Sequence, residues 1–484
     1  MLGTYKIVYI LTWFTISSIW WPTVKTKRFC FSVTENSDFY YILHNVIKFK
    51  VDLLLIDIHA LDAILESSSD LNQYDAKSLT FAIRDSTAEQ LKKLLDKSAS
   101  RKVFNVTYSS SAKTNLTDID HIFIEYNQKI IQICVLHEQK FYYLIRENIE
   151  YTPNGWTLTF GDTVRAIDRT ETQIMKNEMN NIQYFYPKNI SHFLWLYGTS
   201  KFLECNTELA SIMENKYKLY QNDSQLNLTV IPMRGIGKGL DDLEKHYWLA
   251  GGTLLGWYRH CGLIPFTQDA DFGLYAEEYS EDIRNYFLGN KISYLWGALG
   301  LINDSLEFRL YTGRFTLDLF WAYKENNSRW CGYQVHRTKF RRKLPLLPEL
   351  CSGDLFGYRF SVPCDPIEYL NTEYGINKWN APLEKGYSWI NMKLHSYWTD
   401  LAWLYATRLY TREGKLRTDK FAIDWISKFY NYTIKTIPTF LNAIPDNPPP
   451  LGPLKKNLEY NTPVPKKKPK NTTIFLQKRK IILT

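Results

Sequence analysis

LAGGTLLGWYRHCGLIPFTQDADFGL, spanning Leu249–Leu274, is the stretch of this chain that decides the fold of its second half. The run His246–Ala250 predicts a β-strand, and the Gly251-Gly252 pair ends that run. Thr253–Arg259 then predicts the first turns of a helix. A strand, a glycine turn and a helix N-terminus expose backbone N–H groups that bind anions, and glycine lets a phosphate approach without a Cβ in the way.

The second apolar segment of this stretch carries the triplet Asp269-Ala270-Asp271. Side chains of a strand alternate between its two faces, so Asp269, Asp271 and Gly273 would share one face and the opposite face would be apolar. Two neighbouring carboxylates repel each other unless a cation lies between them. Oxygen ligands of this kind suit Mg²⁺ or Mn²⁺ that also binds water and a substrate phosphate. The pattern therefore predicts a metal-dependent site for a phosphate-bearing donor.

A third carboxylate, Asp318, lies in the predicted strand Phe315–Trp321. An aspartate in so apolar a strand needs a partner, because its burial without one is costly. A divalent metal shared with the D-x-D pair is one such partner. An ion pair with Arg309 or Arg314 is the alternative, and the sequence leaves both open.

The motifs around these residues resemble the fukutin/LicD-type family of phosphoryl-ligand transferases, which has the nucleotidyltransferase superfold. The resemblance rests first on Gly251-Gly252-Thr253-Leu254-Leu255-Gly256, Arg259, Gly262-Leu263-Ile264-Pro265 and Asp269-Ala270-Asp271. A later block follows the same order: Phe356-Gly357-Tyr358-Arg359-Phe360-Ser361-Val362-Pro363, then Tyr369-Leu370 and Tyr374-Gly375. The resemblance covers about residues 240–379. One departure precedes the D-x-D, where bacterial members often carry further acids and this chain has Thr267-Gln268.

The resemblance implies an enzyme that transfers an alditol phosphate, of the ribitol 5-phosphate type, from a CDP-linked donor to a glycan hydroxyl during protein O-glycan assembly. The implied catalytic and metal-binding residues are Asp269, Asp271 and Asp318, with Mg²⁺ or Mn²⁺ as the cofactor. Asp318 would either complete the metal site or accept the proton of the acceptor hydroxyl. The implied donor-binding residues are Gly251, Gly252, Thr253 and Arg259, where arginine offers a bidentate contact to phosphate oxygens.

Two other functions remain open at this point. A glycosyltransferase of the GT-A type also uses a D-x-D to hold a metal and a nucleotide-sugar, although it does not account for the upstream glycine pair. A catalytically silent homologue could instead act as a scaffold for other glycan-assembly enzymes. The three aspartates argue against the scaffold, whereas the missing acids at Thr267-Gln268 argue for it.

The positive charge of the chain does not indicate a nucleic-acid partner. The formal net charge is +9, but nearly all of the excess lies in the Pro- and Lys-rich tail that follows Leu451. Such a tail buries too little apolar surface to order itself, and no nucleic-acid-binding motif accompanies it. The 45% apolar and 23% charged fractions are typical of a folded globular protein.

The amino terminus indicates the secretory pathway. Ile7–Trp21 is an uncharged, mostly apolar run that favours a signal anchor over a cleaved signal peptide. The expected location is therefore the Golgi or endoplasmic reticulum membrane, as a single-pass type II protein with a luminal catalytic domain. N-x-S/T sequons support this location and begin at Asn105, Asn115, Asn189, Asn222, Asn227, Asn303, Asn326, Asn431 and Asn471. The seven cysteines form no C-x-x-C pair, so a zinc ribbon is not expected.

Four segments are expected: an anchor with its flank at 1–29, an α/β stem domain at 30–230, a catalytic mixed-sheet domain at 240–445 and a disordered tail at 446–484. Within the stem, strands are predicted at Val51–Ile58, Ile122–Ile124, Ile130–Leu136 and Phe141–Ile145, and a surface helix at Ser86–Lys102. The glycines of Met233–Gly239 predict a flexible junction. The basic run His336–Lys343 predicts a solvated loop, with attraction of an anionic substrate as the alternative.

Overall fold

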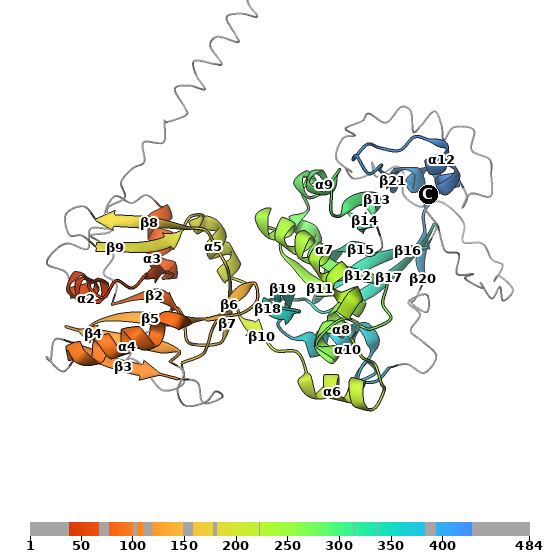
Figure 1. The fold of residues 1–484 in the computed structure, drawn as a ribbon. Helices are drawn as coiled ribbons and strands as arrows, with labels where there is room; N and C mark the ends of the chain where they lie inside the picture. The colour runs from red at the N-terminus through yellow and green to blue at the C-terminus, as the bar shows by residue number, and fades with distance from the viewer. Residues whose placement is uncertain are drawn as a thin grey trace, which may run out of the picture. The chain divides into compact units, whose positions relative to one another are not determined.

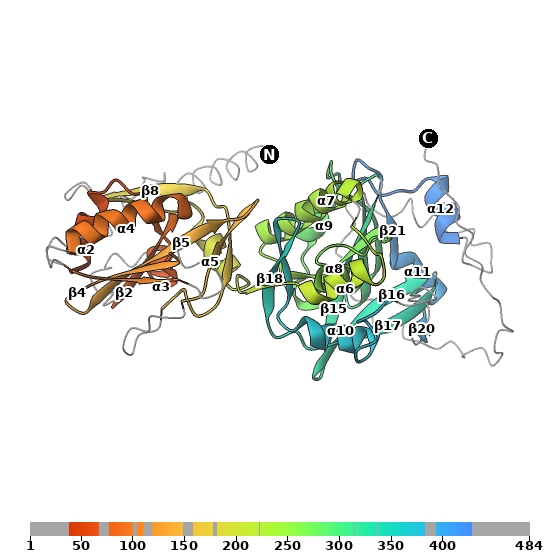
Figure 2. The ribbon, with the colours of Figure 1, turned by 60° about the horizontal axis from the view of Figure 1, so that its bottom comes forward.

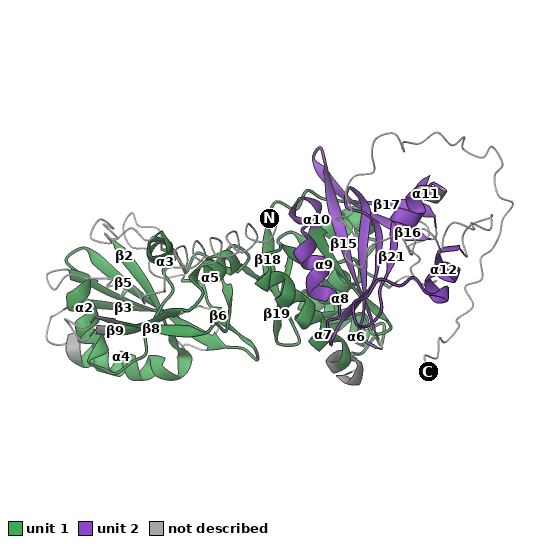
Figure 3. Cartoon of the chain, turned by 90° about the horizontal axis from the view of Figure 1, so that it is seen from above, with its two compact units in different colours: residues 1–274, 344–386 green, residues 275–343, 387–484 purple. Residues whose placement is uncertain are grey.

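The computed structural model describes residues 38–66, 77–99, 104–110, 119–148, 158–177, 182–221, 223–313, 315–335, 337–382 and 394–427. The chain divides into two compact units, one comprising residues 1–274 and 344–386 and the other residues 275–343 and 387–484 (Figure 3). Both units contain helices and strands, which confirms the predicted mixed α/β class. Within the described ranges, no helix is long and apolar enough to cross a membrane. The predicted anchor and the basic tail lie outside those ranges.

The first unit begins with a mixed sheet of nine strands (Figure 1). Its strands are β1 (Leu54–Leu55), β2 (Ser78–Arg84), β3 (Asn105–Ser109), β4 (His121–Tyr126), β5 (Lys129–Glu138), β6 (Tyr142–Ile145), β7 (Arg165–Asp168), β8 (Thr172–Asn177) and β9 (Ile182–Pro187). The order is β3-β4-β5-β2-β1-β9-β8, and β6 pairs with both β5 and β7. The accompanying helices are α2 (Asp38–Ile47), α3 (Ile58–Leu65), α4 (Asp85–Ala99) and α5 (Ile190–Tyr197).

The core of this sheet follows from its two central strands. β2 and β5 run parallel with Ser78 opposite Ile130, and both are apolar along most of their length. Such strands are buried on both faces, and α2 and α4 pack against them. The predicted strands at β4, β5 and β6 and the predicted helix at α4 are confirmed.

The predicted strand Val51–Ile58 is wrong over most of its length, because only Leu54 and Leu55 are extended in a ladder. The reason is a helix cap at Asp57, whose Oδ1 accepts a hydrogen bond from the amide of Ala60 at 3.0 Å. An aspartate N-cap satisfies an otherwise unpaired amide, and α3 therefore begins at Ile58.

The remainder of the first unit contains the motif-bearing stretch. Its elements are β10 (Phe202–Leu203), α6 (Thr207–Asn215), α7 (Asp223–Asp242), β11 (Tyr247–Ala250), α8 (Gly251–His260), β12 (Asp269–Tyr275), β18 (Leu350–Leu355), β19 (Tyr358–Pro363) and α10 (Pro366–Tyr374). β11 pairs antiparallel with β12, placing Ala250 opposite Asp271. The predicted strand, glycine turn, helix and D-x-D strand are thus confirmed, and the helix already begins at Gly251.

The later motif block folds back onto the first. β19 lies against β11 and α10 lies against α8, and α8 and α10 are neighbours in Figures 1 and 2. The two motif blocks, about a hundred residues apart in sequence, therefore form one structural region.

The segment Met233–Gly239 is helical within α7, so the prediction of a flexible junction is wrong. Met233, Ile236 and Leu240 recur at helical spacing and are fully buried. Gly237 is needed for packing, because a Cβ on it would lie 2.6 Å from the hydroxyl of Tyr247. Tertiary packing therefore outweighs the low helix propensity of these glycines.

The second unit is built on a sheet with the order β20-β17-β16-β15-β14-β13-β21. Its strands are β13 (Tyr294–Leu301), β14 (Asp304–Tyr311), β15 (Thr316–Glu325), β16 (Ser328–Val335), β17 (Thr338–Leu344), β20 (Leu394–Tyr397) and β21 (Thr407–Leu409). Its helices are the 3₁₀ turn η2 (Ala276–Glu278), α9 (Glu281–Phe287), α11 (Asp400–Tyr405) and α12 (Lys420–Ser427). The strand predicted around Asp318 is β15.

The basic run predicted as a solvated loop forms strand β17 instead. Lys339 is almost fully buried, lies over the ring of Trp398 at 4.1 Å and pairs with Asp304 at 2.6 Å. Arg342 lies over the ring of Tyr333 at 4.4 Å. Aromatic rings and the half-buried carboxylate of Asp304 thus accommodate charges that the sequence pattern assigned to a surface loop.

The structure also assigns cysteine pairs that the sequence left open. Cys205 is bonded to Cys261 and Cys351 to Cys364. Cys134 and Cys331 are buried and are not part of a disulfide.

Candidate functional site

The start of α8 is shaped by Gly251. Its φ of +53° is in the left-handed region, and a Cβ placed on it would lie 2.6 Å from Oδ2 of Asp271. No side chain caps the helix at Ala250. The carboxylate of Asp271 therefore occupies the space that a side chain at Gly251 would need, beside the N-terminal turn of α8.

Thr253 holds the D-x-D strand against this turn. Its buried hydroxyl accepts a hydrogen bond from the backbone amide of Asp271 at 2.8 Å. Ala250 also pairs with Asp271 in the β11–β12 ladder. The hydrogen bond and this pairing together fix the backbone position from which the Asp271 side chain extends. The structure thus brings Gly251, Thr253 and Asp271 together.

The predicted alternation of β12 is confirmed. Ala270 and Phe272 are fully buried, whereas Asp269 is exposed and Asp271 is half-buried. The Thr267 hydroxyl lies 2.9 Å from Oδ1 of Asp269. Thr267, where the chain departs from the bacterial pattern, therefore orients the first carboxylate of the triplet.

Asp269 and Asp271 fit a magnesium-type ion as two oxygen donors on one side of a strand. Mg²⁺ commonly binds proteins through one or two carboxylates and completes its shell with water and substrate phosphate. Within the described residues, no group of three or more His, Cys, Asp or Glu side chains is arranged to hold a metal. The fit therefore rests on these two carboxylates, and the three-carboxylate site stays a prediction.

Asp318 lies in the second unit, on β15, and is paired with Arg309. Nε and Nη2 of Arg309 each donate to one carboxylate oxygen of Asp318 at 2.8 Å, across the β14–β15 ladder. This bidentate pair is one of the two partners that the sequence left open. Arg314, the other candidate cation, lies outside the described residues.

Glu307 is a further buried carboxylate that sequence reasoning missed. Its Oε1 lies 3.1 Å from Nη2 of Arg309, so one guanidinium is shared by two carboxylates. Burial raises the pKa of Glu307 to about 7, opposed by the charge of Arg309 and assisted by that of Asp318. Glu307 and Arg309 are two residues apart on a strand, so their side chains lie on one face. This spacing is the sequence pattern that could have predicted their contact.

Arg259 joins the two motif blocks. Its Nη1 donates to the carbonyl of Trp379 at 2.6 Å and lies 3.3 Å from that of Ala381. Its Nε lies 3.2 Å from Nε2 of His260, and burial lowers the pKa of Arg259 to about 10. The structure thus places this guanidinium on the backbone that follows α10. Its contact with a donor phosphate stays a prediction.

Two further motif glycines permit close packing. A Cβ on Gly256 would lie 2.9 Å from the carbonyl oxygen of Gly262 and from the amide nitrogen of Ile264. A Cβ on Gly273 would overlap the indole of Trp248, its partner on β11. The glycines therefore let α8, β11 and the Gly-x-Ile-Pro turn approach one another around the D-x-D strand.

Comparison with known proteins places this site in a family. Residues 244–365 match the family described as LicD/FKTN/FKRP, nucleotidyltransferase domain. The Mus musculus protein named ribitol-5-phosphate transferase FKTN is 28% identical over 312 residues, covering 60% of this chain and 65% of that protein. The Homo sapiens protein of the same name is 28% identical over 302 residues, covering 58% and 63%.

An uncharacterised Caenorhabditis elegans protein is 36% identical over 166 residues, which cover 31% of this chain and 43% of that protein. The matches to the mouse and human relatives thus span less than two thirds of their length. The family match includes the β11–α8–β12 region that holds the glycine turn and the D-x-D carboxylates. Residues 244–365 are therefore similar to the nucleotidyltransferase domain of the LicD/FKTN/FKRP family.

Proposed function

We propose that this protein transfers an alditol phosphate, of the ribitol 5-phosphate type, from a CDP-linked donor to a hydroxyl of a glycan. The observation that carries the proposal is the Asp271 carboxylate beside the glycine-built N-terminus of α8. This arrangement supports the proposal, because a carboxylate is a suitable ligand for Mg²⁺ and the amides at a helix N-terminus suit a phosphate. The relatives named ribitol-5-phosphate transferase support the choice of alditol.

The residues of α8 and β12 have separate roles in this proposal. Backbone amides at Gly251 and Gly252 bind donor phosphate oxygens, because the first amides of a helix lack intrahelical acceptors. Asp269 and Asp271 hold the divalent ion. Thr253 holds the backbone amide of Asp271, and the Thr267 hydroxyl donates to the carboxylate of Asp269. When bound, Mg²⁺ or Mn²⁺ supplies neutralisation of the charge that develops on the phosphates.

In the transfer, an oxygen of the acceptor glycan forms a bond to the phosphorus that carries the alditol. The bond from that phosphorus to the CMP oxygen breaks, and CMP leaves. The hydroxyl proton passes to a carboxylate, for which Asp318 is the proposed acceptor. The bidentate pair with Arg309 would hold Asp318 in one orientation for that step.

The proposed compartment is the lumen of the Golgi or endoplasmic reticulum. Ile7–Trp21 is the proposed membrane anchor, and other glycan-assembly enzymes are the proposed protein partners. The two disulfides support an oxidising compartment, since disulfides persist in secreted and luminal proteins.

A donor panel tests the proposal. The purified protein is incubated with Mg²⁺ or Mn²⁺, a glycan acceptor and either CDP-alditols or nucleotide-sugars, beside an Asp269→Ala/Asp271→Ala variant. We expect CMP release from CDP-ribitol, dependent on the acceptor and lost in the variant. Release of UDP or GDP from a nucleotide-sugar would instead identify a glycosyltransferase, and an inert wild-type protein would favour the scaffold.

A further inference from the structure

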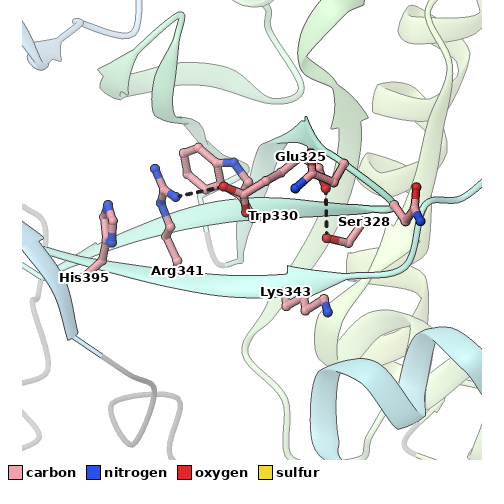
Figure 4. Close-up of a pocket in the computed structure, with 8 residues that line it drawn as sticks. Glu325, Ser328, Trp330, Arg341, Lys343 and His395 are labelled. Carbon is pink, nitrogen blue, oxygen red and sulfur yellow. Dashed lines mark hydrogen bonds and ion pairs between the residues drawn. The ribbon is translucent and has the colours of Figure 1, made fainter.

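A groove in the second unit lies apart from the residues of the proposed transfer. It has a volume of about 620 Å³ and is lined by residues of the β15–β16 turn together with Trp330, Arg341, Lys343 and His395. Figure 4 shows the labelled side chains along β16 and β17, with His395 at one end and Ser328 near the turn. Nothing in the proposed transfer uses this groove.

The turn beside the groove carries a sequon. Asn326 and Asn327 connect β15 to β16, and Glu325 is opposite Ser328 in the ladder. Asn326 is exposed with a φ of +50°, a conformation that asparagine tolerates better than most residues. The Ser328 hydroxyl donates to the carbonyl of Glu325 at 3.2 Å. Asn326-Asn327-Ser328 is thus an N-x-S motif on a well-defined surface hairpin.

The groove offers the contacts that a sugar needs. The Trp330 ring is stacked on Tyr323, and the Arg341 guanidinium lies 3.7 Å from the Trp330 ring centroid. Arg341 is held there by Glu325, 3.8 Å away. Lys343 and His395 add two exposed polar side chains. The Trp330 ring is covered by Tyr323 and Arg341 and is only 8% exposed, so it holds Arg341 in place. The groups that face a sugar are Arg341, Lys343 and His395, which match its hydroxyl groups.

We propose that Asn326 carries an N-linked glycan whose inner sugars lie in this groove. In the attachment, Nδ2 of Asn326 forms a bond to the anomeric carbon of an oligosaccharide carried on a lipid diphosphate. The bond from that carbon to the diphosphate oxygen breaks, and the lipid diphosphate leaves as the Asn326 nitrogen loses a proton. The host's oligosaccharyltransferase supplies the enzyme, so the step requires entry into the secretory pathway.

Asn326 differs from other sequons in the described part of the chain by its position at the groove. Asn189 accepts a hydrogen bond from the amide of His192 and caps α5. Asn303 is followed by Asp304 and Ser305, which are tied to Lys339 and to each other. Asp318 lies on β15 and Asn326 directly follows that strand, eight residues further on, or roughly 26 Å along an extended chain. A glycan at Asn326 is therefore remote from Asp318.

Occupancy is tested on the full chain produced in animal cells, by mass spectrometry of glycopeptides and by the mobility shift after deglycosylation. We expect a glycan at Asn326 that is lost in both Asn326→Gln and Ser328→Ala and retained in Ser328→Thr. The Thr variant keeps the sequon and the hydroxyl, so it separates loss of the acceptor motif from a folding defect. An unmodified Asn326 in the folded protein overturns the proposal, whether or not other sequons are occupied.

Whether the glycan lies in the groove is tested by enzymatic deglycosylation of the folded protein. A glycan held by the groove is removed slowly by an endoglycosidase from the folded protein, and several-fold faster from a Lys343→Ala/His395→Ala variant. Lys291→Ala, at an exposed lysine of the same unit outside the groove, should leave the rate unchanged. Equal rates for wild type and the double variant would show that the glycan does not lie in the groove.

Discussion

At the scale of single residues, Asp271 depends on two small neighbours. Gly251 leaves room for its carboxylate, and Thr253 binds its backbone amide. Gly251→Ala would put a Cβ 2.6 Å from Oδ2 of Asp271 in a backbone conformation that alanine disfavours. We expect the variant to lose most of its transferase activity and to unfold at a lower temperature.

The matched control for this variant is Gly235→Ala in α7, where a Cβ would meet no atom within 4 Å. Alanine is the better helix former by about 1 kcal/mol, so this variant should be as stable as wild type or more so. Thermal unfolding and CMP release, measured side by side, check both variants. Full activity in Gly251→Ala would contradict the described position of Asp271.

Glu307 gives the second unit a pH dependence. Its pKa is raised from the ordinary 4.5 to about 7 by burial, so the folded protein holds a proton that the unfolded chain releases. The contribution of Glu307 to the free energy of unfolding is therefore largest below about pH 4.5. It falls as the pH rises towards 7, by at most about 1.4 kcal/mol per pH unit. Glu307→Gln should flatten this dependence in denaturant unfolding from pH 5 to 7.5. The exposed Glu349→Gln should not alter the slope.

Among the helices and strands, local sequence patterns predicted an element correctly where tertiary packing favours the same conformation. The glycine turn at Gly251 and the alternation through Asp269 and Asp271 predicted β11, α8 and β12. They were insufficient for Met233–Gly239, because the hydroxyl of Tyr247, distant in sequence, requires Gly237 inside a helix. The ion pair of Lys339 with Asp304 is also non-local, which is why β17 looked like a loop.

Disulfides stabilise elements to different extents in this chain. Cys205–Cys261 closes a loop of 56 residues and ties the end of α8, whereas Cys351–Cys364 closes one of 13 residues between β18 and β19. Chain entropy predicts a contribution of about 4 kcal/mol for the long loop and about 3 kcal/mol for the short one. Cys205→Ser/Cys261→Ser should therefore lower the unfolding free energy more than Cys351→Ser/Cys364→Ser. The reverse order in urea unfolding would show that loop closure does not dominate.

At the scale of the whole molecule, a buried charge cluster connects distant parts of the first unit. Asp168 on β7 lies 3.1 Å from Nη2 of Arg359 on β19 and 3.5 Å from Nη2 of Arg234 on α7. Burial opposes the ionisation of Asp168, yet the charges of Arg359 and Arg234 hold its pKa below the ordinary value. No sequence motif predicted this cluster, because its members are far apart in the chain and form no local pattern.

Asp168→Asn should destabilise the protein by about 3 kcal/mol, since it leaves the buried guanidinium of Arg359 without its ion-pair partner, whereas the half-buried Arg234 keeps Asp241. Glu171→Gln, at an exposed ion pair with Lys188, should leave the stability close to that of the wild type, because water and salt screen such a pair. Denaturant unfolding of both variants measures the difference. Equal stabilities would show that the Asp168 cluster does not hold β7, α7 and β19 together.

The positions of the carboxylates and glycines in strands and turns were predictable from sequence. The residues that contact them in the folded chain were not. Asp269 and Asp271 follow from the D-x-D alternation. Arg309 pairs with Glu307 as well as Asp318, and Arg259 donates a hydrogen bond to the backbone carbonyl of Trp379, after α10. Both contacts form only when the chain is folded.

The proposed transfer is tested most directly by the rate of CMP release from CDP-ribitol in the presence of a glycan acceptor, measured with and without a divalent-metal chelator. We expect Mg²⁺- or Mn²⁺-dependent release by the wild-type protein. We also expect that release to be lost on chelation and in Asp271→Asn, which keeps the side-chain shape but removes its charge. Release that persists in Asp271→Asn, or that is unchanged by the chelator, would contradict a metal site at the D-x-D strand.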